Sequence, residues 1–133
     1  MTDLMDFYSR EELMEHARNP RNEGMLDNAA ISYRDANQLC GDEVEIFAKE
    51  NNGVISEIKF IGSGCLISRA ASSLISEKLI GKSMKEVLAM TTSDLDELLG
   101  AVLTPGRIKC AFLPLAILQK GIKNYLEKTR KDN

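Results

Sequence analysis

The chain has 133 residues, of which 44% are apolar and 28% charged, the composition of an ordinary globular protein. Its 17 basic and 20 acidic residues give a net charge of −3, so we expect neither nucleic acid nor an anionic membrane as a partner. No apolar run approaches the roughly 20 residues that span a bilayer, and the first residues lack a secretory signal pattern. We therefore expect one cytoplasmic domain over residues 1–133.

The first predicted helix opens at the capping box Ser9-x-x-Glu12 and ends near Arg18, because Asn19-Pro20 follows. Its last turn contains His16, the only histidine of the chain. No cysteine or second histidine lies near it in the sequence. We therefore interpret His16 as a helix-end cation or a hydrogen-bonded, partly buried side chain, and not as a metal ligand.

Three strands are predicted next. A weak strand lies around residues 31–34. In the next predicted strand Val44, Ile46 and Ala48 alternate with Glu43, Glu45 and Lys49, as in a half-buried strand. Asn51-Asn52-Gly53 predicts a tight hairpin turn, since Asn-Gly accepts the positive φ that such turns need. The return strand then covers residues 54–61. Three antiparallel strands in succession predict a meander.

The rest of the chain has helical periodicity. The helix after Gly64 carries Ser72, Ser73 and Glu77 opposite an apolar face, and Gly81 ends it. The apolar face consists of Ile67, Ala70, Ala71, Leu74, Ile75 and Leu79.

Further boundaries follow from local signals. Ser83-x-x-Glu86 caps a short helix, and Ser93-x-x-Asp96 caps another that ends near Gly100. Pro105-Gly106 predicts a turn before the last helix, with Pro114 in the first turn of that helix. The expected fold class is α+β, with a three-stranded antiparallel sheet packed against helices.

Each of the three cysteines lies at the edge of a predicted element. Cys65 ends the segment Gly62-Ser63-Gly64-Cys65, where a strand passes into a helix, and Cys110 is expected near the start of the last helix. The dipole and free N–H groups of a helix N-terminus stabilise a thiolate. Cys40 stands in Cys40-Gly41-Asp42, where Gly41 permits a turn that lets Asp42 face the same way as the sulfur.

Three thiolates and a carboxylate can complete a tetrahedral zinc shell or anchor a small iron–sulfur cluster. Against this, spacings of 25 residues (65 − 40) and 45 residues (110 − 65) match no zinc finger, and no Cys-x-x-Cys pair is present. A single cysteine is often an inert core residue. The residues alone leave both interpretations open, a shared metal or sulfur site and three unrelated buried thiols.

Several ordered motifs resemble those of the IscU/NifU-N-terminal/SufU family of iron–sulfur cluster assembly scaffolds. The segment from His16 to Gly24 is similar to the family pattern His-x-x-Asn-Pro-Arg-Asn-x-Gly. Cys40-Gly41-Asp42 resembles the first ligand motif, residues 62–68 the second and Lys109-Cys110 the third. The resemblance covers nearly the whole chain.

The resemblance implies a transient [2Fe-2S] cluster on Cys40, Cys65 and Cys110, with Asp42 keeping it labile. It also implies a Zn²⁺-bound form of the same site. Sulfur would arrive as persulfide from a cysteine desulfurase of the IscS/SufS type, and the cluster would pass to apo iron–sulfur acceptor proteins. The three cysteines would accept the sulfur. Lys109 is expected to act as a charge partner of the Cys110 thiolate, because an ammonium has no lone pair for a metal.

Two departures distinguish the branches of the family. Lys109 stands where the IscU branch has histidine and resembles SufU, whereas 45 residues between the second and third cysteines leave no room for the SufU insertion. Residues 103–107 read Leu-Thr-Pro-Gly-Arg where the IscU branch has Leu-Pro-Pro-Val-Lys, which argues against recognition by an Hsp70-type chaperone.

Three functions follow from this comparison. The first is a scaffold that is not an enzyme and that builds and transfers a cluster. The second is a SufU-like zinc-dependent sulfurtransferase that accepts persulfide without building a cluster. The third, a structural zinc module, is disfavoured because such sites usually draw their ligands from Cys-x-x-Cys knuckles.

Overall fold

The computed structural model describes residues 11–37, 41–100 and 105–132 of the chain. The elements in these ranges, in chain order, are α2 (Glu11–Arg18), β1 (Ile31–Asn37), β2 (Asp42–Asn51), β3 (Val54–Ser63), α3 (Leu66–Lys78), α4 (Met84–Leu88), α5 (Thr92–Leu99) and α6 (Pro105–Asp132). Among the described residues, no helix combines the length and the apolar character needed to cross a membrane.

The three strands form an antiparallel sheet in the order β1-β2-β3, which confirms the predicted meander. Asn52 and Gly53 have φ values of 54° and 84°, so both central residues of the hairpin turn are left-handed, as a tight β-hairpin requires. The strands are longer than the sequence predicted. Pairing of Asn37 with Asp42 and of Glu43 with Ser63 extends the ladder beyond the alternating apolar residues.

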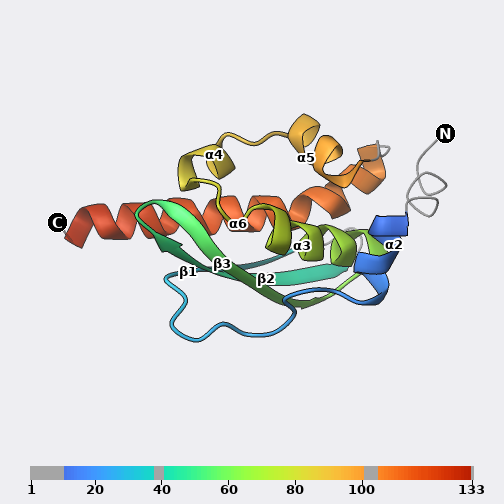
Figure 1. Ribbon diagram of the computed structural model, residues 1–133, viewed down its shortest axis with the longest axis horizontal. Helices are drawn as coiled ribbons and strands as arrows, with labels where there is room; N and C mark the ends of the chain where they lie inside the picture. Colours follow the sequence, from blue (N-terminus) through green and yellow to red (C-terminus); the bar gives the residue numbers. More distant parts are fainter. Residues whose placement is uncertain (1–10, 38–40, 101–104, 133) are drawn as a thin grey trace.

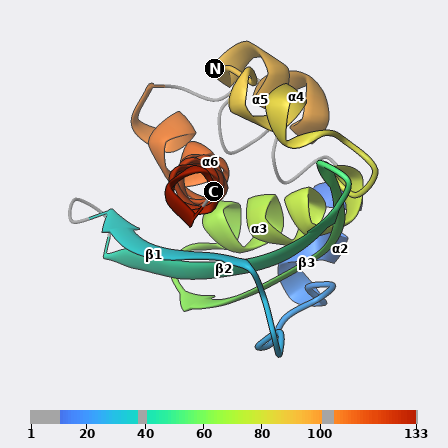
Figure 2. The same cartoon turned by 90° about the vertical axis from the view of Figure 1, so that its left-hand side faces the viewer.

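Helices cover one face of the sheet. Figures 1 and 2 show α3 and α6 lying across that face, with α4 and α5 farther from the sheet and α2 beside α3. The segment between α2 and β1 runs along the opposite face. The alternating residues Val44, Ile46 and Ala48 of β2 are buried and join the apolar side chains of α3 and α6 in one core. The predicted α+β class is confirmed.

The predicted N-cap of α5 is wrong. The cap is Thr91, whose hydroxyl accepts a hydrogen bond from the amide of Asp94, and not Ser93. Both residues fit the capping-box pattern, but Thr91 has the extended backbone of an N-cap (φ −116°, ψ 179°). The cap of α4, Ser83 with Glu86, and the left-handed Gly100 that ends α5 are as predicted.

The last helix begins earlier than predicted. Pro105 is its first residue and not part of a turn, because the fixed φ of proline suits the first helical position and no amide hydrogen is needed there. Pro114 consequently lies in the interior of α6 and not in its first turn. Cys110 becomes the sixth residue of the helix, counting from Pro105. The prediction that Cys110 lies at a helix N-terminus is therefore wrong.

Candidate metal centre

Asp42, Cys65 and Cys110 meet where three elements come together. One carboxylate oxygen of Asp42 and the two sulfur atoms all lie within 4.8 Å of one another. Asp42 is the first residue of β2, Cys65 is the N-cap of α3, and Cys110 lies in the second turn of α6. Asp42 and Cys110 are buried, and Cys65 is half-buried. Residues far apart in the sequence thus offer three metal-ligating groups in one place.

The sheet register and two glycines bring this about. Val44 pairs with Gly62 and Glu43 with Ser63, so the end of β3 lies beside the start of β2. A Cβ atom at position 62 would collide with the carbonyl oxygen of Glu43, and glycine is therefore required for this close approach. The chain then passes through Gly64 into α3, and this turn places Cys65 against Asp42.

Cys40 lies outside the described residues, and its position relative to the other thiols stays a prediction. Gly41, which follows it, has a φ of 74°. This left-handed backbone agrees with the expected turn before Asp42. The structure therefore brings together three of the four predicted ligands and describes the chain from Gly41, the residue next to the fourth.

The donor set suits a thiophilic metal. Zn–S bonds of about 2.3 Å in a tetrahedral shell place two sulfur ligands about 3.8 Å apart. The Cys65 sulfur already lies 3.6 Å from Asp42 Oδ2, and the largest separation in the group stays within 4.8 Å. Small side-chain movements would close this gap. Two thiols and one carboxylate can hold zinc or iron with one or more positions left for a further ligand.

Lys109 is exposed to solvent, whereas its neighbour Cys110 is buried. Successive residues of a helix point in directions about 100° apart, and the role of Lys109 as a charge partner of Cys110 stays a prediction. The charge of an exposed ammonium is screened by water and salt, which weakens its effect on a neighbouring group.

His16 lies away from the thiols and has a structural environment. It is 3% exposed, and its Nδ1 atom lies 2.6 Å from the hydroxyl of Ser73 in α3. The same Ser73 hydroxyl oxygen accepts a hydrogen bond from the backbone amide of Arg21 (2.8 Å). The other ring nitrogen of His16, Nε2, lies 3.5 Å from Glu77 Oε1. This arrangement confirms the interpretation of His16 as a hydrogen-bonded buried residue.

Burial and the nearby Arg21 guanidinium lower the pKa of His16 below its usual 6.5, against the opposing effect of Glu77. A neutral ring fits the contacts, since Nδ1 can accept from Ser73 while Nε2–H faces the carboxylate.

The loop after His16 is tied to both α3 and the sheet. The side-chain amide of Asn22 donates to Ser76 Oγ (3.0 Å), and Ser76 donates to the carbonyl of Arg21 (3.2 Å). The amide of Gly24 donates to the carbonyl of Phe60 (2.8 Å), which extends the edge of β3. The His-x-x-Asn-Pro-Arg-Asn-x-Gly segment therefore holds α2, α3 and β3 together.

Sequence reasoning missed two parts of this arrangement. It placed Ser72 and Ser73 opposite the apolar face of α3, yet both are buried, and Ser73 lies against His16 of α2. It treated Gly64 only as part of a turn, although a Cβ atom at this position would collide with Asp42. Neither feature has a local signal, because the partners lie 22 or more residues away in the sequence.

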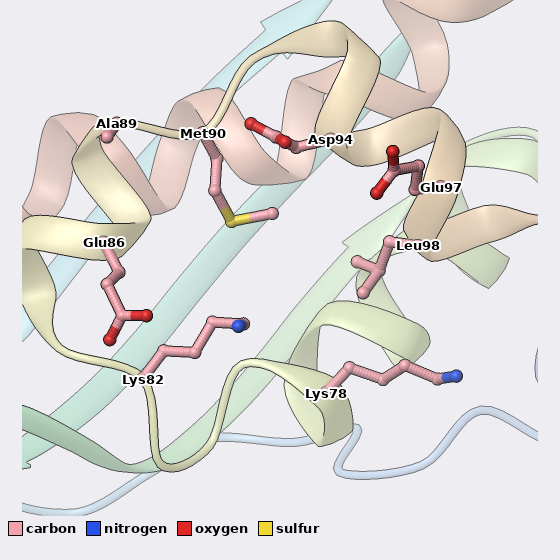
Figure 3. A pocket seen from close by; sticks show the side chains of 8 residues that line it. All are labelled: Lys78, Lys82, Glu86, Ala89, Met90, Asp94, Glu97 and Leu98. Carbon is pink, nitrogen blue, oxygen red and sulfur yellow. The ribbon is translucent and has the colours of Figure 1, made fainter.

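A surface hollow of about 540 Å³ lies at the other end of α3, between that helix, α4 and α5. Figure 3 shows Lys78 and Lys82 along one side and Met90, Asp94 and Glu97 along the other. Charges of both signs line this hollow, so its chemistry selects no particular ligand. Neither Cys65 nor Cys110 lines it.

The fold is a small antiparallel meander covered on one face by helices. Two thiols and a carboxylate meet at the start of β2, the start of α3 and the second turn of α6. Together they define a class of α+β proteins suited to thiolate-bound metals. The sequence model of the NifU-like N-terminal domain matches residues 8–132, and the chain belongs to this family.

Curated relatives carry two different names. The chain is 37% identical over 126 residues to the iron–sulfur cluster assembly scaffold protein IscU of Aquifex aeolicus, covering 93% of this chain and 80% of that protein. It is 30% identical over 135 residues to the zinc-dependent sulfurtransferase SufU of Bacillus subtilis, covering 89% of this chain and 91% of that protein. Among solved structures, a NifU-like N-terminal protein from Brucella abortus superposes with a TM-score of 0.75, 19% identity and coverage of 95% and 99%, which shows a shared fold.

Proposed function

We propose that this chain is a scaffold on which an iron–sulfur cluster is assembled from sulfur delivered by a cysteine desulfurase and then passed to apo-proteins. The observation that carries the proposal is the convergence of Asp42, Cys65 and Cys110, with Cys40 two residues before Asp42 in the sequence. Similarity to scaffold proteins named IscU over 93% of the chain supports the same function.

In this role the chain binds and transfers its cargo and does not turn over a substrate. A thiolate attacks the outer sulfur of the desulfurase persulfide. A new S–S bond forms on this chain while the S–S bond of the donor breaks, and the donor cysteine leaves as thiolate. The assembled [2Fe-2S] cluster would be held by Cys40, Cys65, Cys110 and Asp42, the last through oxygen.

The alternative is a zinc-dependent sulfurtransferase that accepts persulfide without assembling a cluster. The similarity to SufU over 89% of the chain favours it, as does Lys109 beside the third cysteine. The same four residues would hold zinc, and a thiolate freed from the metal would be the nucleophile.

Anaerobic reconstitution with a pyridoxal-phosphate cysteine desulfurase, ferrous iron and L-cysteine separates these functions. A scaffold is expected to develop the absorption and Mössbauer spectrum of a [2Fe-2S] cluster, and a Cys65→Ala variant is expected not to. Persulfide formation with zinc retained and no cluster would identify the sulfurtransferase. If neither cluster nor persulfide forms, both proposals fail and a structural zinc site is left.

The carboxylate of Asp42 is expected to make the cluster labile. Oxygen is a poorer ligand for cluster iron than thiolate, so Asp42 is the natural point of ligand exchange. Asp42→Ala is expected to lengthen the lifetime of the cluster and slow its transfer to an apo-ferredoxin, measured by the rate at which the acceptor gains its spectrum. A variant that loses its cluster faster than the parent would show that Asp42 stabilises the cluster instead.

A further inference from the structure

The two carboxylate oxygens of Asp42 have different surroundings. Oδ1 accepts a hydrogen bond of 2.8 Å from the backbone amide of Cys65, and Oδ2 lies 3.6 Å from the Cys65 sulfur. Asp42 is 0% exposed, so the carboxylate has little room to take up other orientations. One oxygen therefore bonds to the backbone, while the other faces the thiol.

The bond to Oδ1 replaces a capping interaction that α3 does not provide for itself. Cys65 is the N-cap residue, its side chain makes no capping hydrogen bond, and the first turn contains no acidic residue. In a capping box, the N-cap amide is satisfied by a Glu or Gln at the third helical position, which in α3 is Ser68. Asp42 instead supplies the carboxylate from β2, 23 residues earlier in the chain.

Gly64 leaves the space that this arrangement needs. A Cβ atom at position 64 would lie 2.6 Å from Asp42 Oδ1 and 3.0 Å from Asp42 Cγ. Gly64 is not among the glycines with positive φ, so an alanine can adopt its backbone conformation. The requirement for glycine is therefore steric and comes from Asp42. Relief of the collision requires the Asp42 carboxylate or the backbone at position 64 to move, and either movement disturbs the bond between Oδ1 and the Cys65 amide.

We propose that the oxygens of Asp42 have separate tasks, with Oδ1 fixing the start of α3 and Oδ2 presented to the metal, and that Gly64 is the positioning residue that makes this division possible. The proposal rests on the metal site described under Proposed function. It means that Asp42 binds through one oxygen only, and that it stays anchored to the Cys65 amide when it leaves the metal.

The test compares four proteins, namely the parent, Gly64→Ala, Asp42→Ala and the double variant, with Co²⁺ alone as the probe. Supporting groups around metal ligands typically contribute 10- to 100-fold to affinity. Gly64→Ala is expected to weaken Co²⁺ binding at least about tenfold in the parent background. In the Asp42→Ala background the same change is expected to alter affinity by no more than about twofold, because the partner is already absent.

A second readout needs no metal. In the metal-free protein, the Cys65 amide proton is expected to lose protection from hydrogen exchange in both Gly64→Ala and Asp42→Ala. Asp42→Asn keeps an oxygen for this amide but lacks the charge. It is expected to retain the protection while binding Co²⁺ more weakly than the parent.

The outcomes are distinguishable. Parental Co²⁺ affinity and amide protection in Gly64→Ala would overturn the inference, as would an equal loss of affinity on adding Gly64→Ala to Asp42→Ala. A parent protein that shows no thiolate-to-cobalt absorption would instead overturn the metal site of the proposed function. In that case the amide exchange still decides whether Gly64 positions Asp42.

Discussion

At the scale of single residues, the chemistry of the site depends on burial as much as on residue type. Cys110 is 1% exposed, Cys65 is half-buried, and Lys109 points into solvent beside them. The charge next to the third cysteine in the sequence is therefore carried by an exposed side chain. Consecutive residues of an α-helix project in directions about 100° apart, so neighbours in the sequence do not face each other.

Lys109→Gln is accordingly expected to change the alkylation rate of Cys110 by about threefold or less at pH 8, because exposed charges interact weakly through water. Iodoacetamide kinetics in a background that retains only Cys110 would measure this effect. Lys109→Arg is the control, since it keeps the charge. A tenfold or greater slowing with Gln but not Arg would show that the ammonium reaches the thiolate, as sequence reasoning supposed.

At the scale of elements, helix ends show where local patterns are ambiguous. Thr91 and Ser93 both precede an acidic residue at the right distance, and the structure selects Thr91, with the amide of Thr91 donating to Asp94 Oδ2 (2.8 Å). Asp96, the partner that Ser93 would need, has instead a buried Oδ1 atom with no hydrogen bond among the described residues, and burial raises its pKa.

Thr91→Ala is expected to lower the free energy of unfolding by about 1 kcal/mol through loss of the N-cap. Ser93→Ala, the matched control, is expected to change it by less than about 0.5 kcal/mol, since Ser93 is an exposed residue within α5. Urea unfolding of both variants measures the difference. Equal effects of the two substitutions would contradict the assignment of the cap.

At the scale of the whole molecule, His16 connects elements from both halves of the chain. Because burial lowers its folded-state pKa below 6.5, the unfolded chain binds a proton more readily than the folded one. Its contribution to stability is therefore fully present above about pH 6.5 and is lost as pH falls from there to the folded-state pKa. Below that pKa both states carry the proton, and no further loss follows.

Replacing His16 with asparagine tests this pH dependence, because the amide can still accept from Ser73 but does not titrate. The parent is expected to lose stability relative to His16→Asn as pH falls below about 6.5, measured as the difference in urea midpoints at each pH. Parallel pH profiles would mean that the histidine is not held neutral. Carboxylates that titrate in both proteins cancel in this comparison.

A bound metal is expected to stabilise the whole fold, since its proposed ligands come from β2, α3 and α6. Zn²⁺ at 100 times its dissociation constant adds about 2.7 kcal/mol, which corresponds to a rise in Tm of roughly 10 °C for a domain of this size. Differential scanning calorimetry with and without chelator measures the shift. Cys65→Ala is the control and should lose most of it, whereas an undiminished shift would place the metal elsewhere.

The sequence by itself determined what depends on neighbouring residues. The alternation of β2, the left-handed Asn52-Gly53 turn and the Ser83 capping box could all be predicted, because each signal lies within a few positions of its effect. The order of cysteine motifs also predicted the family to which the chain belongs. These features need no knowledge of which elements pack together.

Only the tertiary structure decided what depends on partners distant in the chain. The burial of Cys110 follows from the packing of α6 on α3 and the sheet, and the burial of Ser73 from the packing of α2. The close fit of Gly64 against Asp42 follows from the register of β2 and β3. Each is a steric or hydrogen-bonding fit between elements separated by 20 or more residues. The residues of a helix face or a strand end do not specify which distant element will pack against them. The sequence could therefore predict which residues form the site, but it could not predict their geometry.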